Sequence, residues 1–173
     1  HQQLAEGMLE NLNHIFSRFN FIPNASQMYQ LSHSQPPIMT SYIRLIHDTG
    51  NKDQAWLKSR MEIAQKEYNK VWMNDAHPFW HEVYHGLSRY YDIHVLHDLA
   101  EAESGWDMTT RFERKCLDYL PIDLNSMLYK YEVDFAWAAK QAGNEAEATQ
   151  WKAKAAKRKH QVNKYMWHKR RGF

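Results

Sequence analysis

Apolar residues recur at steps of three and four along most of the chain, which is the spacing of amphipathic helices. In residues 1–19, Leu4, Met8, Leu12 and Phe16 fall on one side of such a helix. The same pattern predicts further long helices at 36–50, 52–74, 123–142 and 145–168. We expect shorter helices at 96–104 and 109–117. The alternating pattern of a β-hairpin is not evident anywhere.

Two long segments lack the helical period. Residues 20–37, NFIPNASQMYQLSHSQPP, are rich in Asn, Ser and Pro, so they predict an ordered loop. Residues 76–92 are aromatic and His-rich, as loops that line a site often are. Short turns such as Gly143-Asn144 alternate with these long loops. The prediction is an all-α fold of helical hairpins, and its long loops favour an (α/α) barrel or solenoid over a four-helix bundle.

The composition is typical of a globular domain, with 43% hydrophobic and 24% charged residues. Aromatic residues are frequent, at 14%, which suits either a sugar-stacking surface or a packed core. The net charge of +2 is too small to indicate a nucleic-acid partner, and no apolar run approaches the roughly 20 residues that cross a membrane. Cys116 is the only cysteine, so we expect no internal disulfide, and the cellular compartment stays unassigned.

The last predicted helix is strongly basic. Nine Lys or Arg residues lie between Lys152 and Arg171, with no acidic residue among them. Such a run can bind nucleic acid or a membrane surface. Trp151, Ala155 and Val162 form a stripe between the basic positions, however. We therefore interpret the segment as a packing helix with a basic outer face.

Eleven histidines raise the question of a metal site. His77, His81 and His85 are spaced by four residues, which on one continuous helix would let their imidazoles share a metal. Pro78 and Gly86 interrupt that helix. We expect core or solvated histidines there, with no metal and no cofactor.

The stretch EAESGWDMTTR, residues 101–111, breaks the helical pattern and places Asp107 directly after Gly105 and Trp106. An apolar neighbour raises a carboxyl pKa, so Asp107 suits a general acid. The spacing equally suits an N-cap for a following helix. Similarly, Asn24, Ser34 and other polar residues of 20–37 suit either sugar binding or turn formation.

The order of the motifs is more specific than any one of them. IPN at 22–24 is followed by SHSQPP at 32–37, GLSRYYD at 86–92, AESGWD at 102–107 and LPIDLNSMLYKYE at 120–132. This order resembles that of the trehalase family of glycoside hydrolases, and the resemblance extends over nearly all of residues 1–173. It implies that these residues are a fragment of a single (α/α)6-barrel catalytic domain, with the remaining segments of the same barrel as their partner.

The resemblance also implies a function and a set of site residues. The reaction would be inverting hydrolysis of an α-glucosidic bond in a small sugar such as trehalose, with the base outside this segment. Asp107 would be the general acid. The residues expected to line the glucose pocket are Asn24, His33, Ser34, Gln35, Arg89, Gly105 and Trp106. Glu103 is expected either near this pocket or at the surface, and Asp123 is expected to cap the helix 123–142.

Two features depart from the family pattern. His33 stands where trehalases carry Arg, which removes a planar group with five donors. A Pro-Arg-Pro-Glu-Ser segment is also missing between Asp92 and the acid motif. A changed sugar subsite is one interpretation, and a catalytically inactive helical-barrel module that binds sugar or another partner is the alternative. A half-barrel would in addition expose an apolar edge, so we expect the isolated chain to associate.

Overall fold

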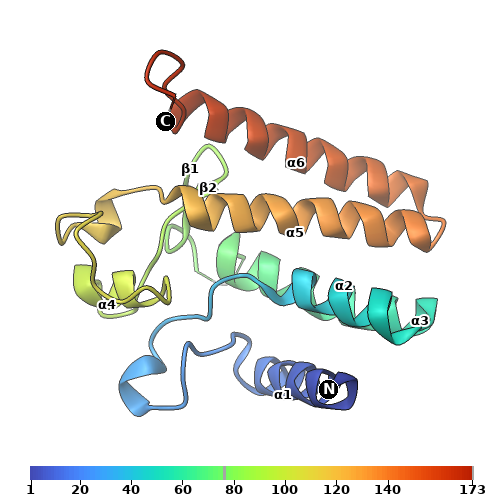
Figure 1. Cartoon of the computed structure of the whole chain (residues 1–173). Coiled ribbons are helices and arrows are strands. Elements are labelled where there is room, and N and C mark those ends of the chain that lie inside the picture. Colours follow the sequence, from blue (N-terminus) through green and yellow to red (C-terminus); the bar gives the residue numbers. More distant parts are fainter. Residues whose placement is uncertain (76, 173) are drawn as a thin grey trace.

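The structure, a computed structural model, describes residues 1–75 and 77–172 and is mainly helical (Figure 1). The predicted irregular stretch 76–92 thus starts at Ala76, which lies outside the described residues. The α-helices are α1 (Gln2–Phe19), α2 (Met39–Gly50), α3 (Gln54–Glu67), α4 (His97–Ala102), α5 (Ile122–Gln141) and α6 (Glu145–Tyr165). Shorter elements are the 3-10 turns η1 (Met28–Gln30) and η3 (Cys116–Asp118), the π-turn η2 (Tyr68–Trp72) and the strands β1 (Glu82–Tyr84) and β2 (Leu87–Ser88).

The long helices form hairpins whose short turns lie at one end and whose long loops lie at the other (Figure 1). Asn51, at φ 49°, follows α2, and Gly143, at φ 74°, follows α5, so left-handed residues end both helices. Asp53 and Asn144 then cap α3 and α6 by accepting from the backbone N–H groups three residues on, at 2.8 and 3.2 Å. This alternation of short turns and long loops is the predicted one.

The core lies around α5, which packs between α6 and the α2–α3 hairpin (Figure 1). Its Leu128 and Phe135 are fully buried, together with Ile43 of α2 and Leu57 of α3. Trp151 of α6 packs against Phe135, with ring centroids 4.7 Å apart. The predicted apolar faces therefore meet one another in a single core.

The predicted helix 109–117 is wrong. Residues 108–115 form bends and turns, and only Cys116–Asp118 form a 3-10 turn. Glu113 and Arg114 have φ values of 48° and 61°, in the left-handed region that a right-handed helix excludes. Thr109 meanwhile turns its backbone N–H and its hydroxyl toward the Glu101 carboxylate. These contacts with α4 replace the bonds of a local helix.

The expectation that the chain contains no β-hairpin is also wrong. β1 and β2 pair in antiparallel fashion around His85 and Gly86, which have φ values of 54° and 84°. Two successive residues with positive φ are what a tight hairpin turn requires. The strands are too short for a period of two to be visible in the sequence.

Three of the predicted long helices have clearly different bounds in the structure, and the one predicted at 36–50 begins only at Met39. The predicted helix 52–74 is α-helical only to Glu67 and then widens into η2, where Trp72 Nε1 donates to Glu67 Oε1 at 3.4 Å. The last helix ends at Tyr165, three residues before the predicted end. Within the described residues, no helix is both long and apolar enough to cross a bilayer.

Candidate active site

The loop 20–37 folds back on itself and then contacts the acid motif. Gln35 N donates to Ile22 O at 2.6 Å, and Asn24 N donates to His33 O at 3.2 Å. Asn24 Nδ2 reaches across to the carbonyls of Ala102 and Glu103, at 3.2 Å each. The Asn24 side chain therefore joins two segments that lie 78 residues apart in the chain.

Glu103 connects the same loop to the core. Its carboxylate is fully buried and accepts from the backbone N–H groups of Ser34 and Tyr91, each at 2.8 Å. His81 Nε2 lies 3.0 Å from both of its oxygens. The surface position that was one expectation for Glu103 is thus wrong. Three hydrogen-bonding groups compensate for the burial of this charge.

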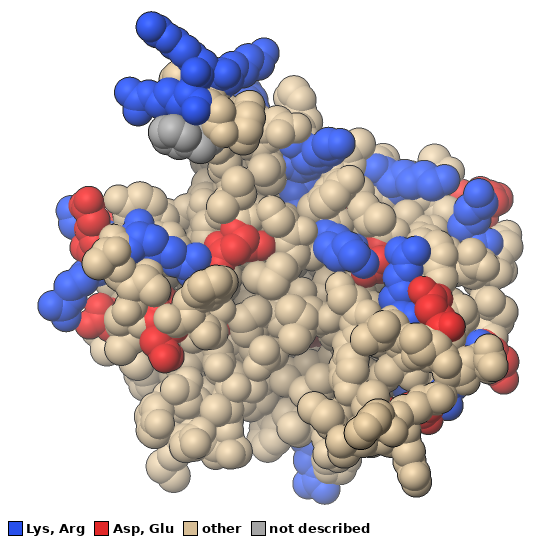
Figure 2. All heavy atoms as spheres, in the orientation of Figure 1, with Lys and Arg blue, Asp and Glu red and all other residues tan. Residues whose placement is uncertain are grey.

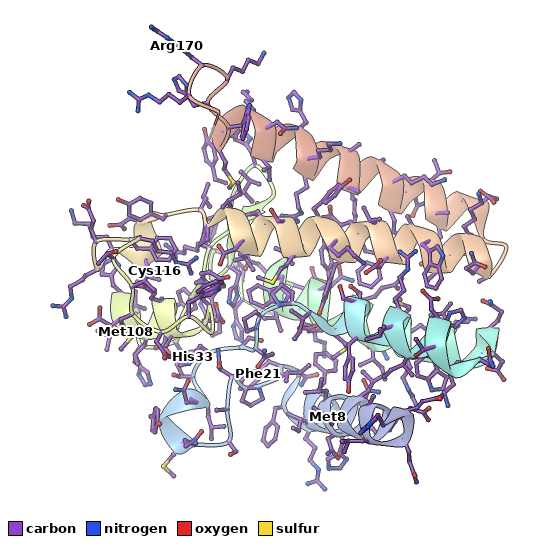
Figure 3. All side chains as sticks on the ribbon, in the orientation of Figure 1. Met8, Phe21, His33, Met108, Cys116 and Arg170 are labelled. Carbon is purple, nitrogen blue, oxygen red and sulfur yellow. The ribbon has the colours of Figure 1, made fainter. Side chains whose placement is uncertain are left out.

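His33 is buried, and both of its ring nitrogens have partners. Nδ1 lies 3.0 Å from Asp92 Oδ2, and Nε2 lies 2.6 Å from Gln30 Oε1. Ser32 Oγ also donates to Asp92 Oδ2. The imidazole at this position is therefore held inside the loop (Figure 3).

Asp107 lies near the apex of the loop that follows α4. Gly105 and Asp107 both adopt left-handed backbone, with φ values of 74° and 55°, so the chain turns sharply around Trp106. Trp106 N donates to Ser104 Oγ at 3.1 Å, while the indole is 69% exposed. The Asp107 side chain is exposed as well, and the residues after it form turns in place of a helix that it could cap.

Gly105 and the loop 20–37 lie close together. A Cβ at Gly105 would stand 3.8 Å from Pro36 Cγ. Because Asn24 Nδ2 also donates to the carbonyl of Ser34, which lies two residues before this proline, the structure brings Asn24, Ser34 and Gly105 to one place.

Arg89 lies apart from this group. Its guanidinium donates to the backbone carbonyls of Trp80, Leu117 and Phe79, at 3.1, 2.8 and 3.3 Å. Those contacts tie the β-hairpin to η3.

A cavity of about 310 Å³ opens beside His33, Ser34 and Glu103. Trp80 lines it and is sandwiched between His77 and Tyr91, at centroid distances of 3.7 and 5.1 Å. Flat aromatic surfaces beside polar loops suit sugar rings and other planar ligands. Gln35, by contrast, lines a separate cavity between α1 and α2.

Asp123 contacts Arg111, in the loop that follows Asp107, and does not cap α5 as expected. Its Oδ2 accepts from Tyr90 Oη and Arg111 Nη1, each at 2.9 Å, and α5 begins at Ile122 after Pro121. Burial and the Asp123 carboxylate raise the pKa of Tyr90 well above its usual range. The hydroxyl is thus a stable hydrogen-bond donor.

Sequence reasoning missed the roles of Glu103, His81 and Asp92 in holding the loops. Glu103 stands within the AESGWD motif, and that position was the available signal. Among the described residues, no three His, Cys, Asp or Glu side chains group as they would around a metal ion.

The hairpins, with their loops gathered at one end, are part of an (α/α)6 barrel, the architecture of a class of glycoside hydrolases. The structure is similar to that of the neutral trehalase Nth1 from Saccharomyces cerevisiae, with a TM-score of 0.82 and 27% sequence identity. The match covers 95% of this chain and 40% of that chain. The family model described as Trehalase matches residues 1–98 and 78–173. The chain therefore belongs to the trehalase family.

Two relatives that are similar in sequence are also described as trehalases. A probable trehalase of Saccharomyces cerevisiae is 31% identical over 98% of this chain and 29% of its own length. A periplasmic trehalase of Escherichia coli is 27% identical over 100% of this chain and 38% of its own length. The chain thus spans about a third of the length of these relatives.

The alignments also contain gaps. The yeast alignment runs over 232 positions, whereas this chain has 173 residues, so tens of positions of the relative face no residue here. The two family matches overlap at 78–98. The expected Pro-Arg-Pro-Glu-Ser segment would follow Asp92, within this overlap.

Proposed function

We propose that this chain is part of the single catalytic barrel of an enzyme that hydrolyses an α-glucosidic bond in a small sugar such as trehalose, with inversion at the anomeric carbon. Membership of the trehalase family is the observation that carries this proposal. The remaining segments of the barrel would close the site. No metal or cofactor takes part in the proposed reaction.

Asp107 is the general acid in this proposal. It donates its proton to the glycosidic oxygen as the bond from that oxygen to C1 breaks. A carboxylate outside residues 1–173 takes a proton from water, whose oxygen bonds to C1 from the opposite face. The left-handed turn at Asp107 presents the carboxyl away from the core, which suits a group that must reach substrate.

The groups gathered around Gly105 are the proposed sugar-binding surface. Asn24 and Ser34 lie there, and Trp106 is exposed beside the acid, while Gln35 lines the separate cavity between α1 and α2. His33 and Arg89 have internal partners, so in this proposal they support the walls of the site. Because Trp106 and Asp107 are exposed in this chain, other barrel segments must exclude water from the acid.

Proton NMR of the whole gene product with trehalose and other α-glucosides tests the proposal. From trehalose we expect β-glucose and α-glucose in equal amounts at first, because the ring attacked by water inverts and the departing glucose keeps its α configuration, whereas other α-glucosides should release β-glucose first. We expect the loss of these products in Asp107→Asn, because the amide is not an acid. Asn tolerates left-handed backbone as well as Asp does, so the variant keeps the turn. Initial release of α-glucose without β-glucose would contradict inversion. Broadened sugar signals without any turnover would favour the sugar-binding module.

A further inference from the structure

Glu101 is a buried carboxylate next to the proposed acid loop. Glu101 is 1% exposed and lies near the end of α4, between the buried Ala100 and Ala102. Met108, the residue after Asp107, lies beside α4 together with Cys116 (Figure 3). Burial, and after it the Glu101 charge, raise the pKa of the Cys116 thiol to about 12. Glu101 thus sits in a poorly hydrated place, where a hydrogen bond is stronger than in water.

One oxygen of Glu101 binds the part of the loop that follows Asp107. Thr109 donates to Glu101 Oε1 twice, from its backbone N–H at 2.8 Å and from its hydroxyl at 2.6 Å. Bonds to an ionised acceptor are about twice as strong as neutral ones. On the other side of Asp107, Trp106 N donates to Ser104 Oγ at 3.1 Å. Asp107 therefore lies between two anchored points.

The backbone of this loop needs such anchors. Asp107 has a φ of 55°, and the left-handed region is unfavourable for a residue other than glycine. Such a conformation persists where its surroundings hold it in place. Thr109 is only two residues away, so release of its two bonds would let the turn relax and move the carboxyl.

We propose that Glu101 is a positioning residue that holds the Asp107 carboxyl in reach of the glycosidic oxygen through its two bonds to Thr109. The inference rests on the proposed function, because it concerns the same general acid. It assigns to the first acidic residue of EAESGWD a task that the motif itself does not indicate.

The test compares two substrates on the whole gene product. Trehalose needs a proton on its leaving oxygen, whereas α-glucosyl fluoride releases fluoride with little help from an acid. In both reactions water supplies the oxygen that bonds to C1, and the base takes its proton. A loss confined to trehalose therefore reports on the acid alone.

Thr109→Val removes the hydroxyl donor and keeps the side-chain shape. We expect kcat/KM for trehalose to fall between about tenfold and a hundredfold, the effect of a small misplacement of a catalytic group. The rate on α-glucosyl fluoride should stay within about threefold of the wild type, since acid catalysis contributes little to it. Thr109→Ser restores the hydroxyl and should restore trehalose hydrolysis.

Glu101→Gln is the second variant, and Glu113→Gln is the matched control. Gln at 101 keeps one acceptor oxygen without its charge, so we expect a smaller loss with the same preference for the fluoride. Glu113 is exposed on the same loop, and its variant should match the wild type on both substrates. Equal losses on both substrates, or no loss in Thr109→Val, would overturn the positioning role.

The Asp107→Asn variant separates this inference from the proposed function. If Asp107 is the acid, this variant loses trehalose hydrolysis and keeps α-glucosyl fluoride hydrolysis. If both rates stay unchanged, the acid assignment fails whatever Thr109→Val does. If Asp107→Asn loses only trehalose hydrolysis and Thr109→Val has the rates of the wild type, only the role of Glu101 is overturned. If the wild-type protein hydrolyses neither substrate, both the proposed function and the role of Glu101 are overturned.

Discussion

Glu67 is a buried carboxyl whose ionisation influences the stability of the fold. It is fully buried at the end of α3 and accepts from Tyr131 Oη at 2.9 Å. Tyr131 Oη in turn accepts from Met39 N at 2.8 Å, so the acid is linked to the start of α2. Burial raises the pKa of Glu67 to about 7, although the bonds from Tyr131 and Trp72 act in the opposite direction. The group therefore changes charge near neutral pH.

The raised pKa makes the free energy of unfolding depend on pH. Below about pH 4.3, the carboxyl is protonated in both states. Between there and about pH 7, the unfolded chain ionises first, so stability falls as pH rises. We expect Glu67→Gln to remove this loss and to gain about 2 kcal/mol relative to the wild type between pH 5 and pH 8. Urea unfolding at the two pH values measures the gain.

Glu62→Gln is the control for that experiment. Its side chain is exposed on the same helix, 54% by area, beside Lys58. Exposed pairs of this kind contribute little to stability, so the control should show no such gain. An equal gain in both variants would indicate a general charge effect and not the burial of Glu67.

At the scale of elements, the helical period predicted most of the structure. It identified the long helices and their pairing into hairpins, because each apolar stripe must be covered by another element. It failed for residues 109–117, where the Glu101 carboxylate and left-handed residues compete with helix formation. Local patterns do not report contacts that come from another element.

The basic helix α6 was predicted only in part. The exposed Lys residues form the expected outer face, and in Figure 2 Lys and Arg gather over the segment that follows the helix. Arg158, however, is buried, and its Nε lies 2.8 Å from Glu132 Oε1. It continues the inward positions of Ala148, Trp151 and Ala155 at steps of three and four. That spacing was the overlooked signal.

Removal of Arg158 should destabilise the packing of α6 on α5. Arg158→Met leaves the Glu132 carboxylate buried with Tyr68 Oη as its remaining donor, at 2.6 Å. Loss of one partner of a buried ion pair costs about 3–5 kcal/mol. We expect a loss of that size in urea unfolding. Lys157→Met, at an exposed neighbouring position, should change the midpoint very little.

A second variant identifies the cause of that loss. Glu132→Gln combined with Arg158→Met removes both charges, and it should recover a substantial part of the stability. If the double variant is as unstable as Arg158→Met alone, lost packing and not the unpaired charge explains the effect.

At the scale of the whole molecule, the chain exposes apolar surface on both sides. A cavity of about 560 Å³ between α1 and α2 is lined by Met8, Leu12, Ile38 and Leu45. Another, of about 470 Å³, lies between α5 and α6 beside Val133 and Trp137. In an (α/α)6 barrel, neighbouring hairpins pack on such faces, and here they are open to solvent.

We therefore predict that residues 1–173 by themselves associate with rising concentration. Met8→Lys places a charge in the α1–α2 cavity and should weaken the association, as measured by sedimentation velocity. Met28→Lys makes the same change on η1, away from the cavity, and should leave the association unchanged. A monomer at all concentrations would contradict the prediction.

The sequence by itself determined the helical class, the hairpin order and the presence of the AESGWD motif. These follow from the spacing of apolar residues and from short runs of neighbouring residues, which are both local properties. Through the family resemblance it also grouped Asn24, Ser34, Gln35 and Gly105, and the structure brings Asn24, Ser34 and Gly105 together, whereas Gln35 lines another cavity.

Only the tertiary structure decided how that site is held. The burial of Glu103 by Ser34, Tyr91 and His81 joins three distant segments, and the bonds from Thr109 to Glu101 replace a predicted helix. Whether a polar residue lies at the surface or holds loops together depends on what the fold brings around it. That environment arises only when the helices pack, because a buried charge is stable only where donors from other elements meet it.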